Sequence, residues 1–184
     1  MKKLVFATLM CVAAMSAKAQ VITSKTVNNV YEEVINQTDS RFVFNAERDD
    51  NGNITALNVY SEETPRKGVV SLNPECRYLY AYHADGTLSS RIKYVWRYGE
   101  WQSAERYDYT LTGDSYHVEY SRWNADKAGF DQPLGMMTYQ LLPDESVASV
   151  ACYYRHLNNA PMELEWQASV ESQSNVSDYY LAKK

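Results

Sequence analysis

The residues best suited to ligand binding are three aromatic side chains near the ends of expected strands. They are Tyr98, Trp101 and Trp123. Trp101 follows a Gly-Glu pair in an expected turn, and Trp123 ends an expected strand, so neither ring is easily buried. Exposed aromatic rings bind sugar rings or partner proteins, because they join a large apolar area to a polar edge. We therefore expect these residues to form a ligand surface for a glycan or a protein.

Residues for catalysis or metal binding form no recognisable motif. The histidines, His83, His117 and His156, are scattered without the spacing of metal ligands. His117 shares a strand face with Glu119, a pairing more typical of the solvent side of a sheet than of an acid–base site. We expect a non-enzymatic interaction module with no cofactor and no metal.

Two other function classes stay open on the sequence. A small secreted glycoside hydrolase would use paired carboxylates beside aromatic residues. The acidic residues that suit it are Glu100, Glu105, Asp108 and Glu119. A structural component of the cell envelope would instead assemble through the edges of its sheet.

The N-terminal residues have the pattern of a signal peptide. Lys2 and Lys3 precede twelve apolar residues, 4–15, and Ala17-Lys18-Ala19 supplies a cleavage site before Gln20. We expect residues 1–19 to be removed, leaving a secreted or periplasmic protein. The apolar stretch is too short to cross a hydrocarbon core of about 30 Å, so we expect no membrane span.

The charge and length of the remaining chain narrow its class. Without residues 1–19, fifteen Lys and Arg stand against 23 Asp and Glu, a net charge of about −8. An acidic chain without a basic cluster is a poor partner for nucleic acid. Residues 20–184 are long enough for a single β-rich domain, and no linker interrupts them. Within it, residues 172–184 either add an edge strand or form a mobile tail.

Cys76 and Cys152 are the two cysteines left after export. An oxidising compartment permits a disulfide between them. Closing so long a loop contributes about 4 kcal/mol in the chain-entropy model. The alternative is two small buried side chains on separate strands. The sequence leaves both alternatives open, and the pair is a candidate disulfide.

Alternating aromatic residues predict an all-β fold, because successive side chains of a strand point to opposite faces. Turn signals rich in Gly, Asp and Asn separate the apolar runs. The short connections predict an antiparallel meander of successive hairpins in one domain. The expected strands are 41–44, 54–60, 78–82, 88–98, 105–111, 116–123, 136–141, 147–154 and 164–170.

Residues 27–37 fit two structures. Val27, Tyr31 and Val34 match a helical face with Thr26 as a cap, which gives a short N-terminal helix. The same residues suit a strand leading into the next one, and we favour the strand.

Most of the aromatic residues are expected in the core. They cover one face of the sheet in this interpretation, with cross-strand ring pairs contributing about 0.2–1 kcal/mol each. This set comprises Tyr80, Tyr82, Tyr94, Trp96, Tyr107 and Tyr109.

Two motifs carry a family resemblance. They are Tyr80-x-Tyr82-x-x-Asp85-Gly86-x-Leu88 and Arg91-x-x-Tyr94-x-Trp96, behind a signal peptide that ends Ala-Lys-Ala-Gln. With them the chain resembles short Tyr/Trp-rich secreted proteins of Bacteroidetes, which are grouped as a domain-of-unknown-function family. The hairpins also look distantly like the tyrosine-aspartate repeats of large shell-forming proteins. The resemblance implies an exported β-protein and supplies no catalytic residue.

Overall fold

The computed structural model describes residues 21–37, 41–66, 68–144, 146–157 and 159–169. The expected signal peptide, 1–19, and the tail, 172–184, lie outside these residues. The described ranges contain all but the last residue of the strands expected from the sequence.

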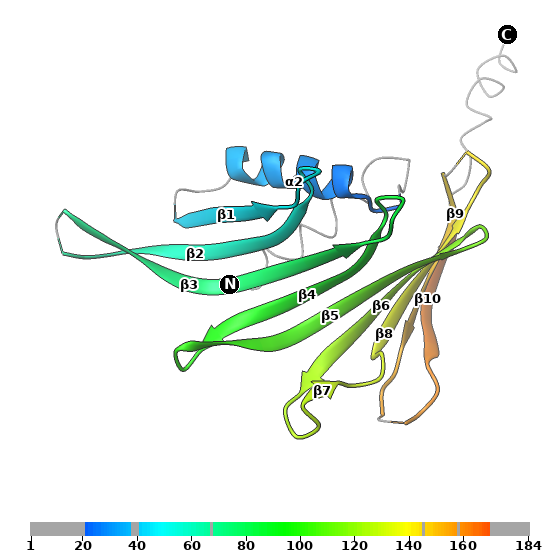
Figure 1. The fold of residues 1–184 in the computed structure, drawn as a ribbon. Coiled ribbons are helices and arrows are strands. Elements are labelled where there is room, and N and C mark those ends of the chain that lie inside the picture. Colours follow the sequence, from blue (N-terminus) through cyan, green and yellow to red (C-terminus); the bar gives the residue numbers. More distant parts are fainter. Residues whose placement is uncertain (1–20, 38–40, 67, 145, 158, 170–184) are drawn as a thin grey trace, which may run out of the picture.

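The described residues form one open antiparallel sheet of ten strands (Figure 1). The strand order is β1-β2-β3-β4-β5-β6-β8-β9-β10, with the short β7 pairing with β6. This confirms the predicted meander, because each main strand pairs with the main strand before it. The strands are β1 (Phe42–Arg48), β2 (Ile54–Arg66), β3 (Val69–Tyr82), β4 (Leu88–Arg97), β5 (Glu100–Thr112), β6 (Ser115–Asn124), β7 (Gly129–Phe130), β8 (Gly135–Leu141), β9 (Val147–Tyr154) and β10 (Glu163–Ser169).

Two hairpins are longer than the sequence predicted. The stretch 61–77 carries two prolines and several charged residues, which are weak strand formers, yet it is nearly all β-structure because β2 and β3 pair with each other. Likewise β5 begins at Glu100, directly after a two-residue turn. In that turn Tyr98 and Gly99 have φ angles of 53° and 86°. Positive φ at both positions fits the twist of a tight hairpin.

Residues Ser24–Gln37 form the helix α2, so the strand favoured for 27–37 is wrong. The physical reason is the packing of this segment against the sheet. Val27, Tyr31 and Val34 make one apolar stripe at helical spacing, and Tyr31 packs against the buried residues of β2 and β3. The cap is Thr23 rather than Thr26 alone: each threonine hydroxyl lies 3.3 Å from the other residue's backbone nitrogen. This reciprocal pair works as a capping box does.

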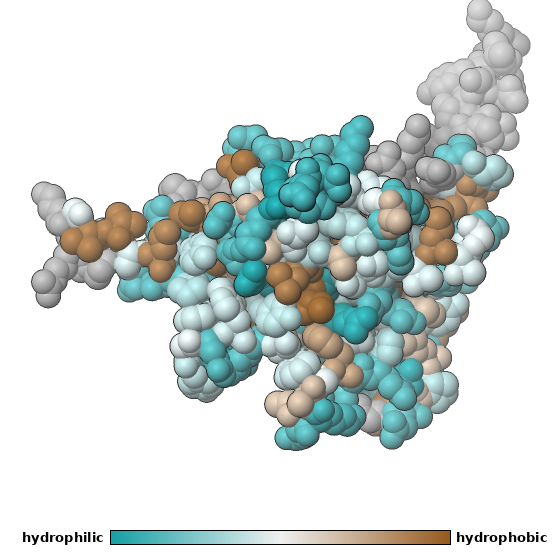
Figure 2. Space-filling view, viewed as in Figure 1, coloured by the Kyte–Doolittle hydropathy of each residue, from teal (hydrophilic) through white to brown (hydrophobic). Residues whose placement is uncertain are grey.

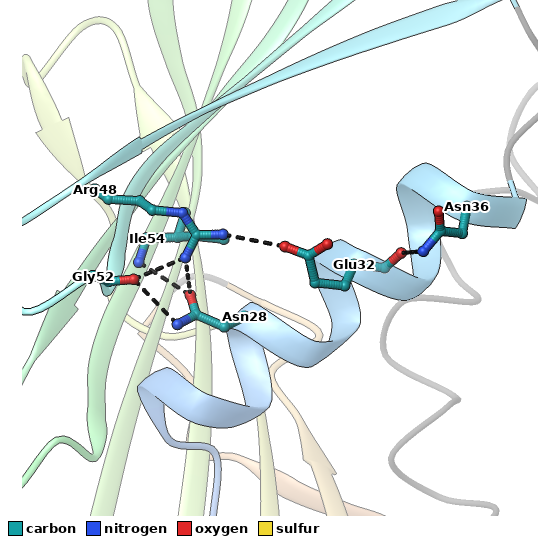
Figure 3. Close-up of polar contacts among 6 residues, drawn as sticks. All are labelled: Asn28, Glu32, Asn36, Arg48, Gly52 and Ile54. Carbon is teal, nitrogen blue, oxygen red and sulfur yellow. Dashed lines mark hydrogen bonds and ion pairs between the residues drawn. The ribbon is translucent and has the colours of Figure 1, made fainter.

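One side of α2 is tied to the turn between β1 and β2 (Figure 3). Asn28 donates its amide to the Gly52 carbonyl at 3.2 Å and accepts from the Ile54 backbone at 3.3 Å. Arg48 donates to the same carbonyl at 2.8 Å and to the Asn28 amide oxygen at 3.1 Å. It also pairs with Glu32 at 3.4 Å. The amide of Asn28 therefore joins helix and turn through both of its ends.

The segment before α2 is tied to the turn between β3 and β4. Ser24 donates its backbone N–H to the Gly86 carbonyl at 2.9 Å, and Leu88 donates to Ile22 at 2.8 Å. Ile22 in turn donates to the Tyr116 hydroxyl at 3.4 Å. Residues 22–37 therefore lie across one side of the sheet, fixed to two neighbouring hairpin turns.

The core lies between this N-terminal segment and one face of the sheet, here called the covered face. One buried cluster lies beneath α2 and contains Leu57, Val59, Cys76 and Tyr78. The other lies beneath Val21 and Ile22 and contains Leu88, Tyr109, Tyr116 and Leu141. Tyr80 packs against both clusters. The opposite side of the sheet is called the open face.

The expected aromatic set divides between the two faces. Tyr80, Tyr82 and Tyr107 pack against the core with Tyr109. The pairing sets Arg91 opposite Tyr80 and Tyr107, so Arg91 points to the covered face. Three and five residues later, Tyr94 and Trp96 point to the open face. The expectation of one aromatic face is therefore wrong for these two residues.

We predict that Asn28→Ala lowers the free energy of unfolding by about 1–3 kcal/mol, because it leaves the backbone N–H of the buried Ile54 without the Asn28 oxygen that accepts from it. Urea unfolding measures the change. Asn36→Ala is the matched control: that amide only extends along the helix to the Glu32 carbonyl, at 2.8 Å. Its expected change is within about 0.5 kcal/mol. Equal losses in the two variants would contradict the anchoring role of Asn28.

Candidate functional site: an aromatic band on the open face

Four aromatic side chains lie on the open face as two ring pairs, one on the β4–β5 hairpin and one on β6 and β7, and together they are called the aromatic band. The band consists of Trp96, Trp101, Trp123 and Phe130. Trp96 and Trp101 meet edge to face, with ring centroids 5.0 Å apart. Trp123 and Phe130 meet in the same way at 5.2 Å. Edge-to-face pairs at this spacing are favourable arrangements of aromatic rings.

The register of the strands places all four rings on one face. Trp96 is directly opposite Trp101, and Trp123 is directly opposite Phe130. The guanidinium of Arg106 lies 6.0 Å from the Phe130 ring centroid. Arg106 belongs to β5, so this contact links the Trp123–Phe130 pair to the strand that also carries Trp101.

Polar side chains continue the band along β5 and β6. Arg106 donates two hydrogen bonds to one oxygen of Asp108, at 2.9 and 2.7 Å. Asp108 lies opposite Glu119 in the register. Nearby on β6, His117 shares a 3.1 Å hydrogen bond with Thr138 of β8. The open face therefore carries apolar rings together with both hydrogen-bond donors and hydrogen-bond acceptors.

The three sequence-predicted ligand residues take different places. Tyr98 is at the tip of the β4–β5 turn with 97% of its surface exposed. Trp101 lies in β5 rather than in a turn, and its ring is half-buried against Trp96. Trp123 lies at the end of β6 as expected and is half-buried against Phe130. The fold brings Trp101 and Trp123 onto one face of neighbouring strands and leaves Tyr98 beyond them.

Sequence reasoning missed two members of the band. It places Trp96 in the core, although the position of Trp96 directly across a two-residue turn from Trp101 is a readable signal. Phe130 gives no signal, because β7 has only two residues. Its position depends on the loop that returns the chain to β6.

The candidate disulfide residues lie far apart in the strand order. Cys76 is buried on β3 and Cys152 half-buried on β9, and both are free. Four strands, β4, β5, β6 and β8, separate them. At about 4.8 Å per strand, their Cα atoms are well beyond the roughly 7 Å limit of a disulfide. Burial raises the pKa of the Cys76 thiol. Both cysteines are small side chains on separate strands in this fold.

The candidate catalytic carboxylates divide between the faces. Glu105 pairs with Lys93 at 3.7 Å and points to the covered face with Tyr107. Asp108 points to the open face and is held by Arg106. Within the described ranges, no three His, Cys, Asp or Glu residues cluster closely enough to hold a metal ion. The described part of the chain also has no helix that is long and apolar enough to span a membrane.

The chain belongs to a family of unknown function (DUF3836), whose model matches residues 1–141. The match ends at the last residue of β8. This confirms the family resemblance that the sequence motifs indicated. The resemblance to tyrosine-aspartate repeats stays a prediction.

A solved structure shares the fold. A crystal structure of a protein of unknown function from Bacteroides fragilis is 22% identical, with a TM-score of 0.62 over 74% of this chain and 96% of that one. DUF3836 family proteins from Bacteroides vulgatus and Parabacteroides distasonis are also 22% identical. Their TM-scores are 0.44 and 0.41, over 50% and 48% of this chain and 89% and 80% of theirs. No match was found among curated proteins.

We predict that Trp101→Ala destabilises the protein far less than Tyr109→Ala does. Trp101 loses one ring contact on the open face, a loss of about 0.5–1.5 kcal/mol beyond its buried area. Tyr109 is 4% exposed in the core, where removing a large aromatic side chain costs about 3–5 kcal/mol. Denaturant unfolding of both variants measures the difference. Equal losses would show that the band is part of the core.

Proposed function

We propose that this protein is an exported, non-enzymatic binding module whose aromatic band takes glycan chains. The observation that carries the proposal is the placement of three of the four tryptophans in the chain on one open face of neighbouring strands. The fourth, Trp166, lies away from them on the edge strand β10. Export rests on the N-terminal pattern of residues 1–19.

The chemistry of the band suits sugar rings. A pyranose has an apolar C–H face that stacks on tryptophan and hydroxyls that need hydrogen-bonding partners. Here the Trp123–Phe130 pair lies beside Arg106, and the Arg106–Asp108 pair offers N–H donors and carboxylate acceptors. The acidic balance of the chain favours a neutral glycan over a polyanion.

Binding suits this surface better than hydrolysis. A glycosidase needs two carboxyl groups on either side of the scissile bond. Asp108 and Glu119 are opposite each other, but Arg106 already occupies one oxygen of Asp108. Both side chains lie on the same open side of the sheet, rather than on opposite sides of a bound sugar. A carboxylate held in this way is a hydrogen-bonding group for a ligand.

We predict that soluble xylan, mannan or starch-type glucan binds this protein, measured by affinity electrophoresis and titration calorimetry. Trp101→Ala and Trp123→Ala should each weaken binding at least tenfold, as expected for a central aromatic contact. Trp166→Ala is the matched control, since Trp166 is 46% exposed and outside the band. Absence of binding to all three glycans, or an equal loss with Trp166→Ala, would overturn the proposal.

A structural role through sheet edges is the second candidate, because one hairpin projects beyond its neighbours. The pairing of β1 with β2 ends at Ser61, and that of β4 with β3 begins at Cys76. The ribbon between these points, called the β2–β3 arm, has β-edges free of neighbouring described strands. Val69, Val70 and Leu72 on it are 53%, 61% and 49% exposed. Figure 2 shows hydrophobic surface, in brown, on the hairpin that projects at the left.

We predict that any self-association of this protein runs through the β2–β3 arm. An exposed apolar β-edge is a template for pairing with another chain, and a lysine there blocks it. Val70→Lys should then shift a concentrated sample to the monomer in sedimentation velocity. Leu157→Lys, at another exposed site away from the arm, should leave association unchanged. A wild-type protein that stays monomeric at high concentration would exclude the structural role.

A further inference from the structure

Arg91 is an arginine on the covered face whose charge has no carboxylate partner among the described residues. It lies on β4, opposite Tyr80 of β3 and Tyr107 of β5. Its guanidinium carbon lies 4.5 Å from the Tyr107 ring centroid and 5.7 Å from that of Tyr78. Tyr80 packs against both core clusters, so Arg91 lies at the junction between them.

These rings leave part of the hydrogen-bonding capacity of the guanidinium unused. Its Nε is shielded from solvent and has no hydrogen-bonding partner. The next residue along this face, Lys93, pairs with Glu105 at 3.7 Å, so that carboxylate is already engaged. Arg77, on the open face, provides a contrast within the same sheet. Its Nε is also unpaired, but its terminal nitrogen reaches Glu47 at 3.3 Å.

A half-buried cation held by aromatic rings alone is an incomplete arrangement. Cation–π contacts contribute about 0.5–2 kcal/mol each, whereas an unpaired buried charge is costly. Apolar residues of similar volume commonly replace buried charges without loss of stability. Packing therefore does not require an arginine at this position. An oxyanion that accepts from Nε would complete the arrangement.

The phenols around Arg91 are suited to the same ligand. Burial raises the pKa of Tyr80 to about 12 and that of Tyr107 to about 12, although the charge of Arg91 opposes this. Burial also raises the pKa of Tyr109. These hydroxyls therefore stay protonated at neutral pH and add O–H donors without adding a negative charge that would neutralise Arg91.

We propose that Arg91 and its tyrosine neighbours on the covered face bind a small oxyanion, a carboxylate or a sulfate group. Arg91 is half-buried as a residue, and its Nε is shielded from solvent without a hydrogen-bonding partner. Bidentate pairing with two oxygens is the interaction that a guanidinium makes best. This site is on the opposite face from the aromatic band and does not depend on glycan binding there.

The test compares anion-dependent thermal stability in three proteins at matched ionic strength. Sodium sulfate and sodium acetate are titrated against sodium chloride. We expect a saturable rise in Tm with sulfate, acetate or both in the wild-type protein, since a ligand that binds only the folded state stabilises it. Arg91→Met should lose the saturable part, and Arg77→Met, the matched control, should keep it.

Two further measurements keep the result interpretable. Arg91→Lys keeps the charge but loses the bidentate geometry, so it should weaken anion binding at least tenfold even where Arg91→Met does not fold. Calorimetric titration of the wild-type protein with sulfate and with acetate detects binding directly and separates the two anions. A non-saturating salt response that is the same in the wild type and in Arg91→Lys would overturn the proposal. So would an absence of heat with both anions.

Discussion

A sheet has two faces, and the described part of this chain supplies a cover for part of one face only. That cover is the segment 22–37, which the turns at Gly52 and Gly86 hold in place through Asn28 and Ser24. Because the cover spans two hairpins, it buries two clusters of core residues. The face of the sheet that this segment covers therefore determines which side chains belong to the core and which to the surface.

The strands and their order could be read from the sequence because hairpins are local. The Asn-Gly and Asp-Gly turns have positive φ at Gly52 and Gly86, as those residue types favour. The face of the sheet to which each side chain points could not be predicted in the same way. Irregular pairing between Ala81 and Tyr82, and again between Lys93 and Tyr94, shifts the register by one residue. Such a shift exchanges the two faces for the residues beyond it.

The helix at Ser24–Gln37 was one of two alternatives for this segment, and the strand was wrongly favoured for a related reason. Its apolar stripe is short, and the contacts that favour a helix over a strand include the packing of Tyr31 against β2 and β3, which are distant in sequence. The site was partly predictable: Trp101 and Trp123 came from their positions near strand ends, and the fold places them on neighbouring strands. Phe130 and the surroundings of Arg91 depend on contacts between distant segments. No local pattern encodes such contacts.

The division between two faces leads to one central claim: the open face binds through its tryptophans, and the covered face carries the core. The most direct measurement is an NMR titration with neutral β-1,4- and α-1,4-linked hexasaccharides that follows the four indole N–H signals. We expect the signals of Trp96, Trp101 and Trp123 to shift together with one affinity while that of Trp166 stays in place. Signals that do not move with either sugar, or a shift confined to Trp166, would contradict the claim.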